Sequence, residues 1–285
     1  MQYMSVKKHK HSAHRLNPNI FMGQHFLTAP AVLRNIIAAA KLTKKDTVIE
    51  IGPGKGILTE ALMGRVKKVI AIEKDKRLVA YLKDAFKNEK NVDIIEGDIL
   101  EIASHPHSVI HPALQETYKI VANLPYYITS RFLRVFLSPK TFAPPISMTL
   151  LVQKEVAERI VLRHRGKEKM SLLGLSVGAY GSPNIIASVK PSAFKPAPKV
   201  HSAILSIEHI SDAFFKKHRI DPQIFFFIAK QAFSKKRKML KSSLGIKNPA
   251  YCKKRPEELS LDEWAILTRE ILHNEQKTNN TPDFS

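Results

Sequence analysis

The segment NLPYYIT, which begins at Asn123, places an amide, a proline and two tyrosines directly behind the apolar run KIVA. A strand that only fills a core usually leads into glycine, aspartate or serine. The side-chain oxygen of Asn123 and the backbone carbonyl of Leu124 can instead accept both N–H bonds of an aromatic amine. Such an amine is a poor nucleophile until its lone pair leaves the ring, and two acceptors placed in this way stabilise the reactive state.

The next residues would hold the ring that carries the amine. Pro125 fixes the turn so that the two acceptors converge. Tyr126 stacks on the ring and keeps its nitrogen in line for alkylation, whereas Tyr127 is expected to pack inward. The alternative is a structural turn at a strand end, in which both tyrosines belong to the core.

A glycine-rich turn lies earlier in the chain, in VIEIGPGKG, which contains Glu50, Gly52, Gly54 and Gly56. Glycines let a backbone approach a ligand closely, and here they precede a helix whose N-terminus would face that ligand. A dinucleotide-binding fingerprint requires glycine where Ile57 stands, so NAD is disfavoured. Taken alone, the motif is equally compatible with a tight structural turn.

Two acids follow the next two predicted strands. Glu73 comes 21 residues after Gly52, where a carboxylate can accept both hydroxyls of a ribose. Asp98 follows the strand of IIEGD and is placed to accept a hydrogen bond from the amino group of an adenine. Each acid alone could be a helix N-cap or a surface charge. Together with the glycines they outline an adenosine pocket without a pyrophosphate loop, which suits S-adenosylmethionine.

The elements that must position these residues alternate between strand and helix. Apolar patterns predict strands at residues 48–51, 69–72, 92–95, 118–122 and 147–152, and helices at 31–41, 58–63, 77–86 and 130–136. This rhythm predicts an α/β fold with a parallel, doubly wound sheet. Residues 185–189 and 200–207 would add an antiparallel pair at its edge.

Strand patterning stops near residue 210, and helices are expected at 221–244 and 261–272. We therefore divide the chain into an α/β domain at residues 1–209 and a helical domain at 210–285. The second domain holds most of the C-terminal basic charge and ends in an acidic tail.

The sequence carries 46 Lys and Arg against 25 Asp and Glu, a net charge of +21. The excess lies at the flanks: residues 1–45 hold eight basic groups and no acid, and residues 195–255 hold 15 basic groups and three acids. Such a field favours a polyanionic partner, whose phosphates both flanks would contact. The alternative is a generally basic, solvated surface.

Other features exclude several classes of protein. The single cysteine, Cys252, rules out an internal disulfide and suits a reducing compartment. No apolar run is long enough for a membrane span, and the N-terminal segment lacks the apolar core of a secretory signal. We therefore expect a cytoplasmic protein without a membrane anchor. His105, His107 and His111 have no cysteine or acid partners at metal-ligand spacing, so no metal is expected.

Six motifs occur in order along the chain: GQHFL, EIGPGKG, NLPYYIT, LLVQKEVAERI, PSAFKPAPKVHSAIL and AFSKKRKMLKSSLG. The set spans about residues 15–270 and resembles the KsgA family of ribosomal RNA adenine dimethyltransferases. The resemblance implies a class I, Rossmann-like methyltransferase fold with a small all-helical C-terminal domain that binds RNA. It also implies dimethylation, with S-adenosylmethionine, of N6 of two adjacent adenines in the 3′-terminal hairpin of small-subunit (16S) rRNA, by a monomer acting on a pre-ribosomal particle.

The resemblance also implies roles for single residues. The family's cofactor contacts fall on His25, Leu27, Gly52, Glu73, Asp98 and Asn123. Phe194 matches the aromatic residue that covers the second face of a flipped base, and flipping costs little for an unpaired base in a hairpin loop. The segment SKKRKMLKSSLG is expected to form one helix that binds phosphates through Lys235, Lys236, Arg237, Lys238 and Lys241. A solvated helix face is the alternative for that segment.

Three positions depart from the family pattern. The family usually has Asn where this chain has His25, which changes the hydrogen-bond donor available to the cofactor. His201 stands where PKVDS is usual, and residues 172–176 read LLGLS where Y-G-x-L-S is common. None of these departures removes a group that the reaction requires.

Two other functions stay open. An Erm-like enzyme would methylate an adenine of large-subunit RNA with the same machinery, but those relatives usually read N-I-P-Y, whereas this chain has Leu124 and a long basic C-terminal region. A non-catalytic RNA-binding, assembly or transcription factor could have kept the same fold. The intact Asn-Leu-Pro-Tyr and both acids favour an enzyme, because a pure binding protein does not need them.

Overall fold

The computed structural model describes residues 17–19, 23–103, 114, 116–137, 143–164, 169–235 and 237–279; at 162–164 and 275–279 it describes the backbone alone. His105, His107, His111 and Lys236, for which the sequence suggested interpretations, lie outside the described residues.

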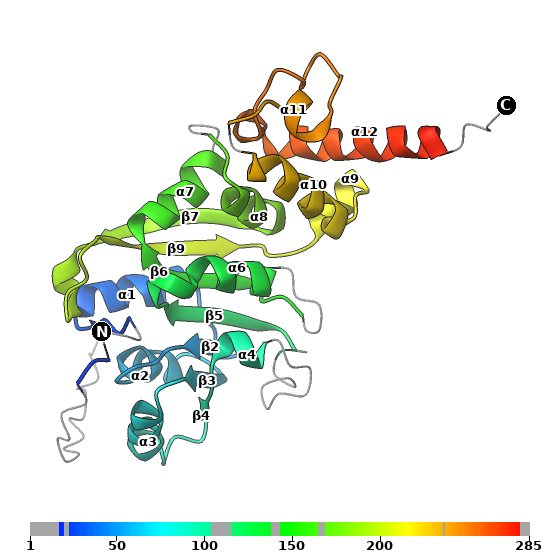
Figure 1. Ribbon diagram of the computed structural model, residues 1–285. Helices are drawn as coiled ribbons and strands as arrows, with labels where there is room; N and C mark the ends of the chain where they lie inside the picture. Colours follow the sequence, from blue (N-terminus) through cyan, green and yellow to red (C-terminus); the bar gives the residue numbers. More distant parts are fainter. Residues whose placement is uncertain are drawn as a thin grey trace, which may run out of the picture.

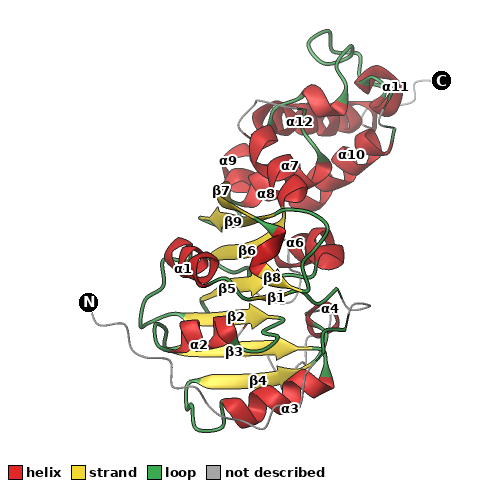
Figure 2. Ribbon diagram, turned by 90° about the vertical axis from the view of Figure 1, so that its left-hand side faces the viewer, coloured by secondary structure: helices red, strands yellow, loops and turns green. Residues whose placement is uncertain are grey.

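A seven-stranded sheet forms the centre of the molecule, in the order β4-β3-β2-β5-β6-β9-β7 (Figures 1 and 2). Its strands are β2 (Thr47–Ile51), β3 (Lys68–Glu73), β4 (Val92–Glu96), β5 (Tyr118–Asn123), β6 (Ser147–Gln153), β7 (Ser182–Val189) and β9 (Ser202–Glu208). The five strands from β4 to β6 are parallel, and β9 is antiparallel to both β6 and β7. The predicted doubly wound sheet and its antiparallel edge pair are confirmed.

The strand order reverses at β2. The chain first adds β3 and β4 on one side of β2, and then returns to add β5 and β6 on the other side. At such a reversal the loops that leave the carboxyl ends of the two central strands diverge and leave a crevice. Ile51 of β2 pairs with Ala122 of β5, so the glycine-rich turn and the NLPY segment both open on that crevice.

Helices cover both faces of the sheet (Figure 2). Those of the parallel half are α1 (Pro30–Ala39), α2 (Ile57–Met63), α3 (Lys76–Ala85), α4 (Ile99–Ile102) and α6 (Thr129–Leu137). Because successive side chains of a strand point to opposite faces, Val48 and Val69 pack with α1 and α2. Ile49 and Ile70 belong to the second core layer, with α4 and α6. The rigid sheet thus fixes the loops at its carboxyl edge.

Two helices that the sequence did not predict lie near β7 and β9: α7 (Lys154–His164) and α8 (Leu172–Tyr180). Helix α8 is buried at Gly174, Leu175, Ser176 and Val177, which point in all directions around its axis. A helix buried on every side has no amphipathic period, and such a period is what marks a helix in a sequence.

The C-terminal region contains α9 (Ala213–His218), α10 (Pro222–Ser234), α11 (Leu240–Leu244) and α12 (Leu261–Asn279), and it packs beside α8 (Figure 1). Helix α9 was not predicted, and α12 is longer than predicted. Aromatic side chains fill the centre of this region, where Phe215 and Phe225 meet edge to face and Trp264 is fully buried.

The prediction of a single helix at residues 221–244 is wrong. Helix α10 ends at Ser234, and the chain turns before α11 begins. The sequence SKKRK offers no apolar side chain to continue the buried face of α10. Beyond the turn Leu240 is completely buried, and its backbone N–H donates to the carbonyl of Lys254 at 2.8 Å. Tertiary contacts therefore outweigh the helix propensity of lysine and arginine here.

Candidate active site

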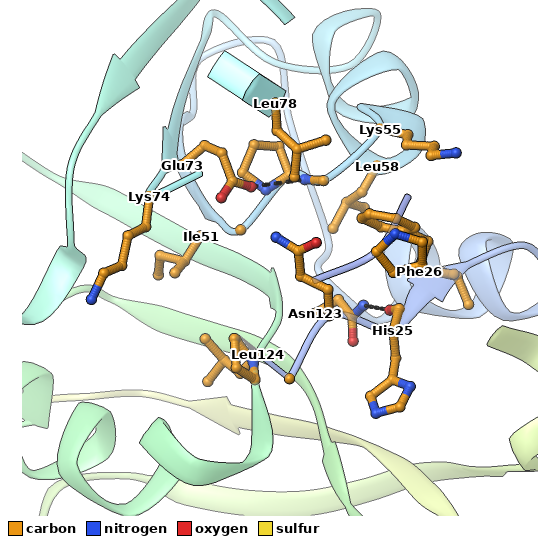
Figure 3. A pocket seen from close by; sticks show the side chains of 18 of the residues that line it. His25, Phe26, Ile51, Lys55, Leu58, Glu73, Lys74, Leu78, Asn123 and Leu124 are labelled. Carbon is orange, nitrogen blue, oxygen red and sulfur yellow. Dashed lines mark hydrogen bonds between the residues drawn. The ribbon is translucent and has the colours of Figure 1, made fainter. Parts of the chain in front are cut away.

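A cavity of about 1070 Å³ opens where the strand order reverses (Figure 3). Its lining includes the glycine-rich turn after β2, Glu73 at the end of β3, Asp98 after β4 and the segment from Asn123 to Ile128 after β5. Residues 23–28 of the N-terminal segment close another side. The glycine-rich turn, both acids and the NLPY segment therefore line one pocket.

The glycine-rich turn has backbone angles that favour glycine. Gly52, Gly54 and Gly56 have φ values of 64°, 61° and 78°, in the left-handed region that other residues rarely adopt. A Cβ atom on Gly54 would lie 3.0 Å from the ring of Phe26. The turn thus passes close to the N-terminal segment and exposes its main chain to the cavity.

The carboxylate of Glu73 is held by main-chain donors. One oxygen accepts from the N–H of Gly54 at 3.2 Å and the other from the N–H of Asp75 at 2.9 Å. Burial raises the pKa of Glu73, and these backbone hydrogen bonds oppose that rise. A fixed, buried carboxylate beside the glycine turn can accept hydrogen bonds from vicinal hydroxyls.

Asp98 serves as a helix cap, which was the structural alternative for this residue. Its Oδ1 accepts from the backbone N–H of Leu100 at 2.9 Å, and its Oδ2 accepts from Lys74 at 2.8 Å. Burial alone would raise the pKa of Asp98, but the hydrogen bonds from Lys74 and Leu100 bring it below the ordinary value. Asp98 also lines the cavity, so the capping role and a ligand contact do not exclude each other.

Glu50 lines the same cavity, and our sequence interpretation gave it no role. It is only 1% exposed; Thr59 donates to its Oε2 at 2.6 Å, and its Oε1 has no partner among the described residues. Burial raises the pKa of Glu50 to about 8, and nearby Glu73 adds to the rise. The signal was present in the sequence, because an acid inside a buried strand next to a glycine turn needs a reason.

Asn123 ends β5 with its side chain in a defined orientation. Its Nδ2 donates to the backbone carbonyl of His25 at 3.0 Å, and no described residue donates to its Oδ1. Leu124 is buried and donates its N–H to the carbonyl of Leu151 at 3.2 Å. The nitrogen end of the amide is therefore occupied, and the oxygen end is available as an acceptor.

Pro125 has φ −56° and precedes a short 3₁₀ turn, η2 (Tyr126–Ile128). Tyr126 lines the cavity, and its hydroxyl forms a 2.6 Å hydrogen bond with Ser202. Burial raises the pKa of Tyr126. The expectation that Tyr127 packs inward is wrong, because this side chain is 67% exposed. Successive residues of a 3₁₀ turn point about 120° apart, so two adjacent tyrosines cannot share one direction.

Phe194 lies outside the cavity lining that the described residues form. It belongs to β8 (Phe194–Lys195), which pairs with β1 (Phe26–Leu27), and its side chain is 4% exposed. Leu27 is likewise buried, and both side chains belong to the core layer under α1. Leu27 and His25 both line the cavity, as do Lys195 and Pro196. The structure thus places Phe194 where it supports the wall of the pocket.

The basic residues of the C-terminal region do not share one helix, which corrects that expectation. Lys235 follows the end of α10, Arg237 and Lys238 lie in the turn, and Lys241 lies in α11. All four are exposed, and none forms an ion pair with a described acid. Their ammonium and guanidinium groups are available to a polyanion.

Within the part of the chain that the structure describes, no three His, Cys, Asp or Glu side chains gather as metal ligands would. The same residues contain no helix that is both long and apolar enough to cross a bilayer.

The chain has the Rossmann-like fold of class I methyltransferases: a mostly parallel seven-stranded sheet, with a glycine-rich turn after β2, an acid at the end of β3 and another after β4. Within that class the chain belongs to the ribosomal RNA adenine dimethylase family, whose model matches residues 15–258.

Relatives in sequence agree with this assignment. The chain is 39% identical to "Ribosomal RNA small subunit methyltransferase A" of Dehalococcoides mccartyi, with 95% of this chain and 94% of the relative covered. It is 38% identical to the protein of the same name from Clostridium botulinum, with 81% and 80% covered.

Two solved structures are similar over most of the chain. A dimethyladenosine transferase from Plasmodium falciparum matches with a TM-score of 0.70 and 25% identity, covering 89% of this chain and 98% of that one. The 23S rRNA methyltransferase ErmE matches with a TM-score of 0.67 and 22% identity, covering 86% and 98%. At that identity the ErmE match supports the fold alone.

Proposed function

We propose that this chain transfers methyl groups from S-adenosylmethionine to N6 of two adjacent adenines in the 3′-terminal hairpin of small-subunit rRNA. The observation that carries this proposal is the fixed amide of Asn123, whose oxygen is available at the pocket that Glu73 and Asp98 also line. Family membership and the names of the relatives support RNA adenine as the substrate.

The described residues fit the methyl donor. Glu73 would accept the ribose hydroxyls, Asp98 the adenine amino group, and the main chain at Gly52 would lie along the donor. The unpartnered Oε1 of buried Glu50, a residue that also lines the pocket, supports a polar ligand at this end. Leu27 and the main chain of His25 would complete the wall.

When bound, S-adenosylmethionine supplies a methyl group on a positively charged sulfur. The chain's own residues prepare the attacking nitrogen. Asn123 Oδ1 and the carbonyl of Leu124 would accept its two N–H bonds and favour its pyramidal form. Tyr126, whose hydroxyl is tied to Ser202, would stack on the base and hold it in line.

The basic charge of the C-terminal region supports RNA binding. Lys235, Arg237, Lys238 and Lys241 are exposed and without described acid partners, and Lys236 completes the basic run in the sequence. They would contact the phosphates of the rRNA within a pre-ribosomal particle. On this proposal residues 1–209 catalyse methyl transfer and residues 210–285 bind the RNA. The protein would act as a monomer in the cytoplasm, where ribosomes assemble.

A large-subunit target is the second candidate, because the fold of ErmE is similar. The sequence relatives that cover nearly the whole chain are named for the small subunit, and they favour the small-subunit target.

Primer extension across both ribosomal RNAs, from cells with and without the gene, tests the proposal. We expect reverse transcription to stop at two adjacent adenines near the 3′ end of small-subunit RNA only where the gene is present, since N6-dimethylation blocks base pairing. A gene-dependent stop in large-subunit RNA, or none at all, would contradict the proposal.

A further inference from the structure

Helix α10 exposes an aromatic ring that the core does not use. Three phenylalanines follow one another near the start of this helix, and the rings of Phe225 and Phe226 pack against Phe215 in the centre of the C-terminal region. The side chain of Phe227 is 61% exposed, and no other phenylalanine among the described residues is exposed. Because burying a phenylalanine normally stabilises a fold, an exposed ring at this position indicates a partner.

The residues that share this face of α10 with Phe227 carry no negative charge. Positions three and four apart lie on the same face of a helix. The neighbours of Phe227 at this spacing are Ile224, Lys230 and Gln231, and all three are exposed. Helix α10 contains no Asp or Glu, and Lys230 forms no ion pair with a described acid. An apolar ring and an unpaired cation therefore lie on one surface.

The basic turn after α10, to which we assign RNA phosphates, lies close to this surface. Lys235 follows Phe227 by eight positions in the sequence, which corresponds to about 12 Å along a helix axis. Arg237 and Lys238 come directly after it and are exposed. On the other side, exposed Arg219 precedes α10. Basic side chains thus occur on both sides of Phe227 along the chain, which favours a polyanionic partner.

The chemistry of the ring narrows the choice of partner. Phenylalanine has no group that forms conventional hydrogen bonds, so it can offer an RNA only the face of its ring. Bases stack on such a face whatever the sequence, while neighbouring cations bind the backbone. Proteins stack in this way on unpaired bases, which can be splayed out of a loop or bulge. Phe227 lies outside the cavity lining that the described residues form, so this base is not the methyl acceptor.

We propose that Phe227 is a stacking platform for an unpaired base of the small-subunit rRNA, and that Lys230 and the basic turn bind the backbone next to that base. This inference rests on the proposed function, and it adds a base contact to a surface otherwise defined by phosphate contacts. The partner is RNA and not a ribosomal protein, because phosphates match the unpaired cations around the ring.

Three substitutions in the full-length protein separate stacking from apolar packing. Phe227→Leu keeps an apolar side chain without an aromatic face, and Phe227→Tyr keeps the face. Tyr81→Leu, at an exposed position of α3, is the matched control. Each protein is titrated with the small-subunit particle from cells without the gene, at low and at high salt. Calorimetry gives Kd for S-adenosylmethionine.

We expect Phe227→Leu to raise Kd for the particle about tenfold, the effect of one lost base–aromatic stack. The factor should be the same at low and high salt, because a stack releases no counterions, whereas Lys230→Ala should reduce the salt slope. Phe227→Tyr and Tyr81→Leu should bind like wild type, and donor affinity should not change in any variant. An unchanged Kd in Phe227→Leu, weak binding by Phe227→Tyr, or a loss confined to low salt would overturn the inference.

Crosslinking identifies what lies against the ring. With benzoylphenylalanine in place of Phe227, irradiation of the complex with the particle should join the protein to rRNA at an unpaired nucleotide, which primer extension locates. Absence of an RNA crosslink, with or without one to a ribosomal protein, would overturn the inference. A wild-type protein that binds the particle and fails to methylate it would instead reject the proposed function.

Discussion

The two ends of the pocket are built in different ways. The donor end is the part of the pocket where the methyl donor would bind, and it contains Glu73 and Asp98. Main-chain N–H groups fix both acids: those of Gly54 and Asp75 donate to Glu73, and that of Leu100 donates to Asp98. At the base end, the side chains are fixed by groups far away in sequence. Asn123 is tied to residue 25, Tyr126 to Ser202, and His25 to Pro196.

The donor end consists of consecutive strand-to-turn units whose geometry follows from the parallel sheet, so it forms with the sheet itself. The base end requires the N-terminal segment, β5, β8 and β9 to meet. Its geometry depends on the complete tertiary fold. Substitutions at one end should therefore change donor affinity, and those at the other should change the rate or the affinity for RNA.

The largest effect is expected for Asn123→Ala. Loss of one placed acceptor costs about two to three orders of magnitude in rate, whereas the affinity for RNA should stay nearly unchanged. Single-turnover methyl transfer at saturating donor measures the rate. Asn91→Ala is a matched control, since its amide also donates to a backbone carbonyl, that of Met63, far from the base end. Equal loss of rate and RNA affinity would argue against the role of Asn123.

Glu50 provides a second test, because it belongs to the donor end only. In the folded protein the pKa of Glu50 is about 8, well above the ordinary carboxyl value. Between these two pH values the folded protein therefore holds one more proton at Glu50 than the unfolded chain does. The stability that Glu50 contributes is complete below its unfolded pKa and is lost as the pH rises toward 8. Glu50→Gln cannot titrate. Urea unfolding at pH 5 and pH 8 should show wild type losing about 3 to 4 kcal/mol relative to this variant. Parallel pH profiles would contradict the assignment.

Glu73→Gln should weaken the donor end without touching the base end. Both carboxylate oxygens of Glu73 accept hydrogen bonds from main-chain N–H groups. A glutamine side chain necessarily turns its NH₂ group toward one of these N–H groups and loses that hydrogen bond. Donor affinity measured by calorimetry should fall about tenfold or more, the value of a charged hydrogen bond. RNA affinity should not change. Glu96→Gln, at the exposed end of the neighbouring strand β4, serves as the control and should bind the donor normally.

The smallest effect on function is expected for the basic residues in the turn after α10, and it should appear in the salt dependence of RNA affinity. The triple variant Lys235→Ala, Arg237→Ala and Lys238→Ala should reduce the slope of log affinity for RNA against log salt by about two, for three phosphate contacts. The triple alanine variant of Lys83, Lys87 and Lys90, at the end of α3 and in the turn after it, removes the same charge elsewhere. If both triples change the slope equally, net charge and not a specific phosphate contact is responsible.

The contrast between the two ends also explains what could be predicted from sequence. The sheet, the glycine turn, Glu73 and Asp98 were recognisable because local patterns fix them. The exposure of Tyr127 and the burial of Phe194 were not, since they depend on how η2 and β8 pack against distant strands.

The same limit applies to the helices. Helix α8 was missed because it is buried on all sides, and the break after Ser234 was missed because lysine and arginine favour helix locally. In both places tertiary packing decided the outcome, and sequence periodicity does not contain that information.

The two ends of the pocket meet at Asn123. A crystal structure with bound S-adenosylmethionine would show whether the methyl group is delivered there. We expect the ribose on Glu73, the adenine near Asp98, and the sulfonium methyl group directed at the space between Asn123 Oδ1 and Tyr126. A donor bound with its methyl group directed away from Asn123, or an Asn123 amide rotated so that its nitrogen faces that space, would rule out this role of Asn123.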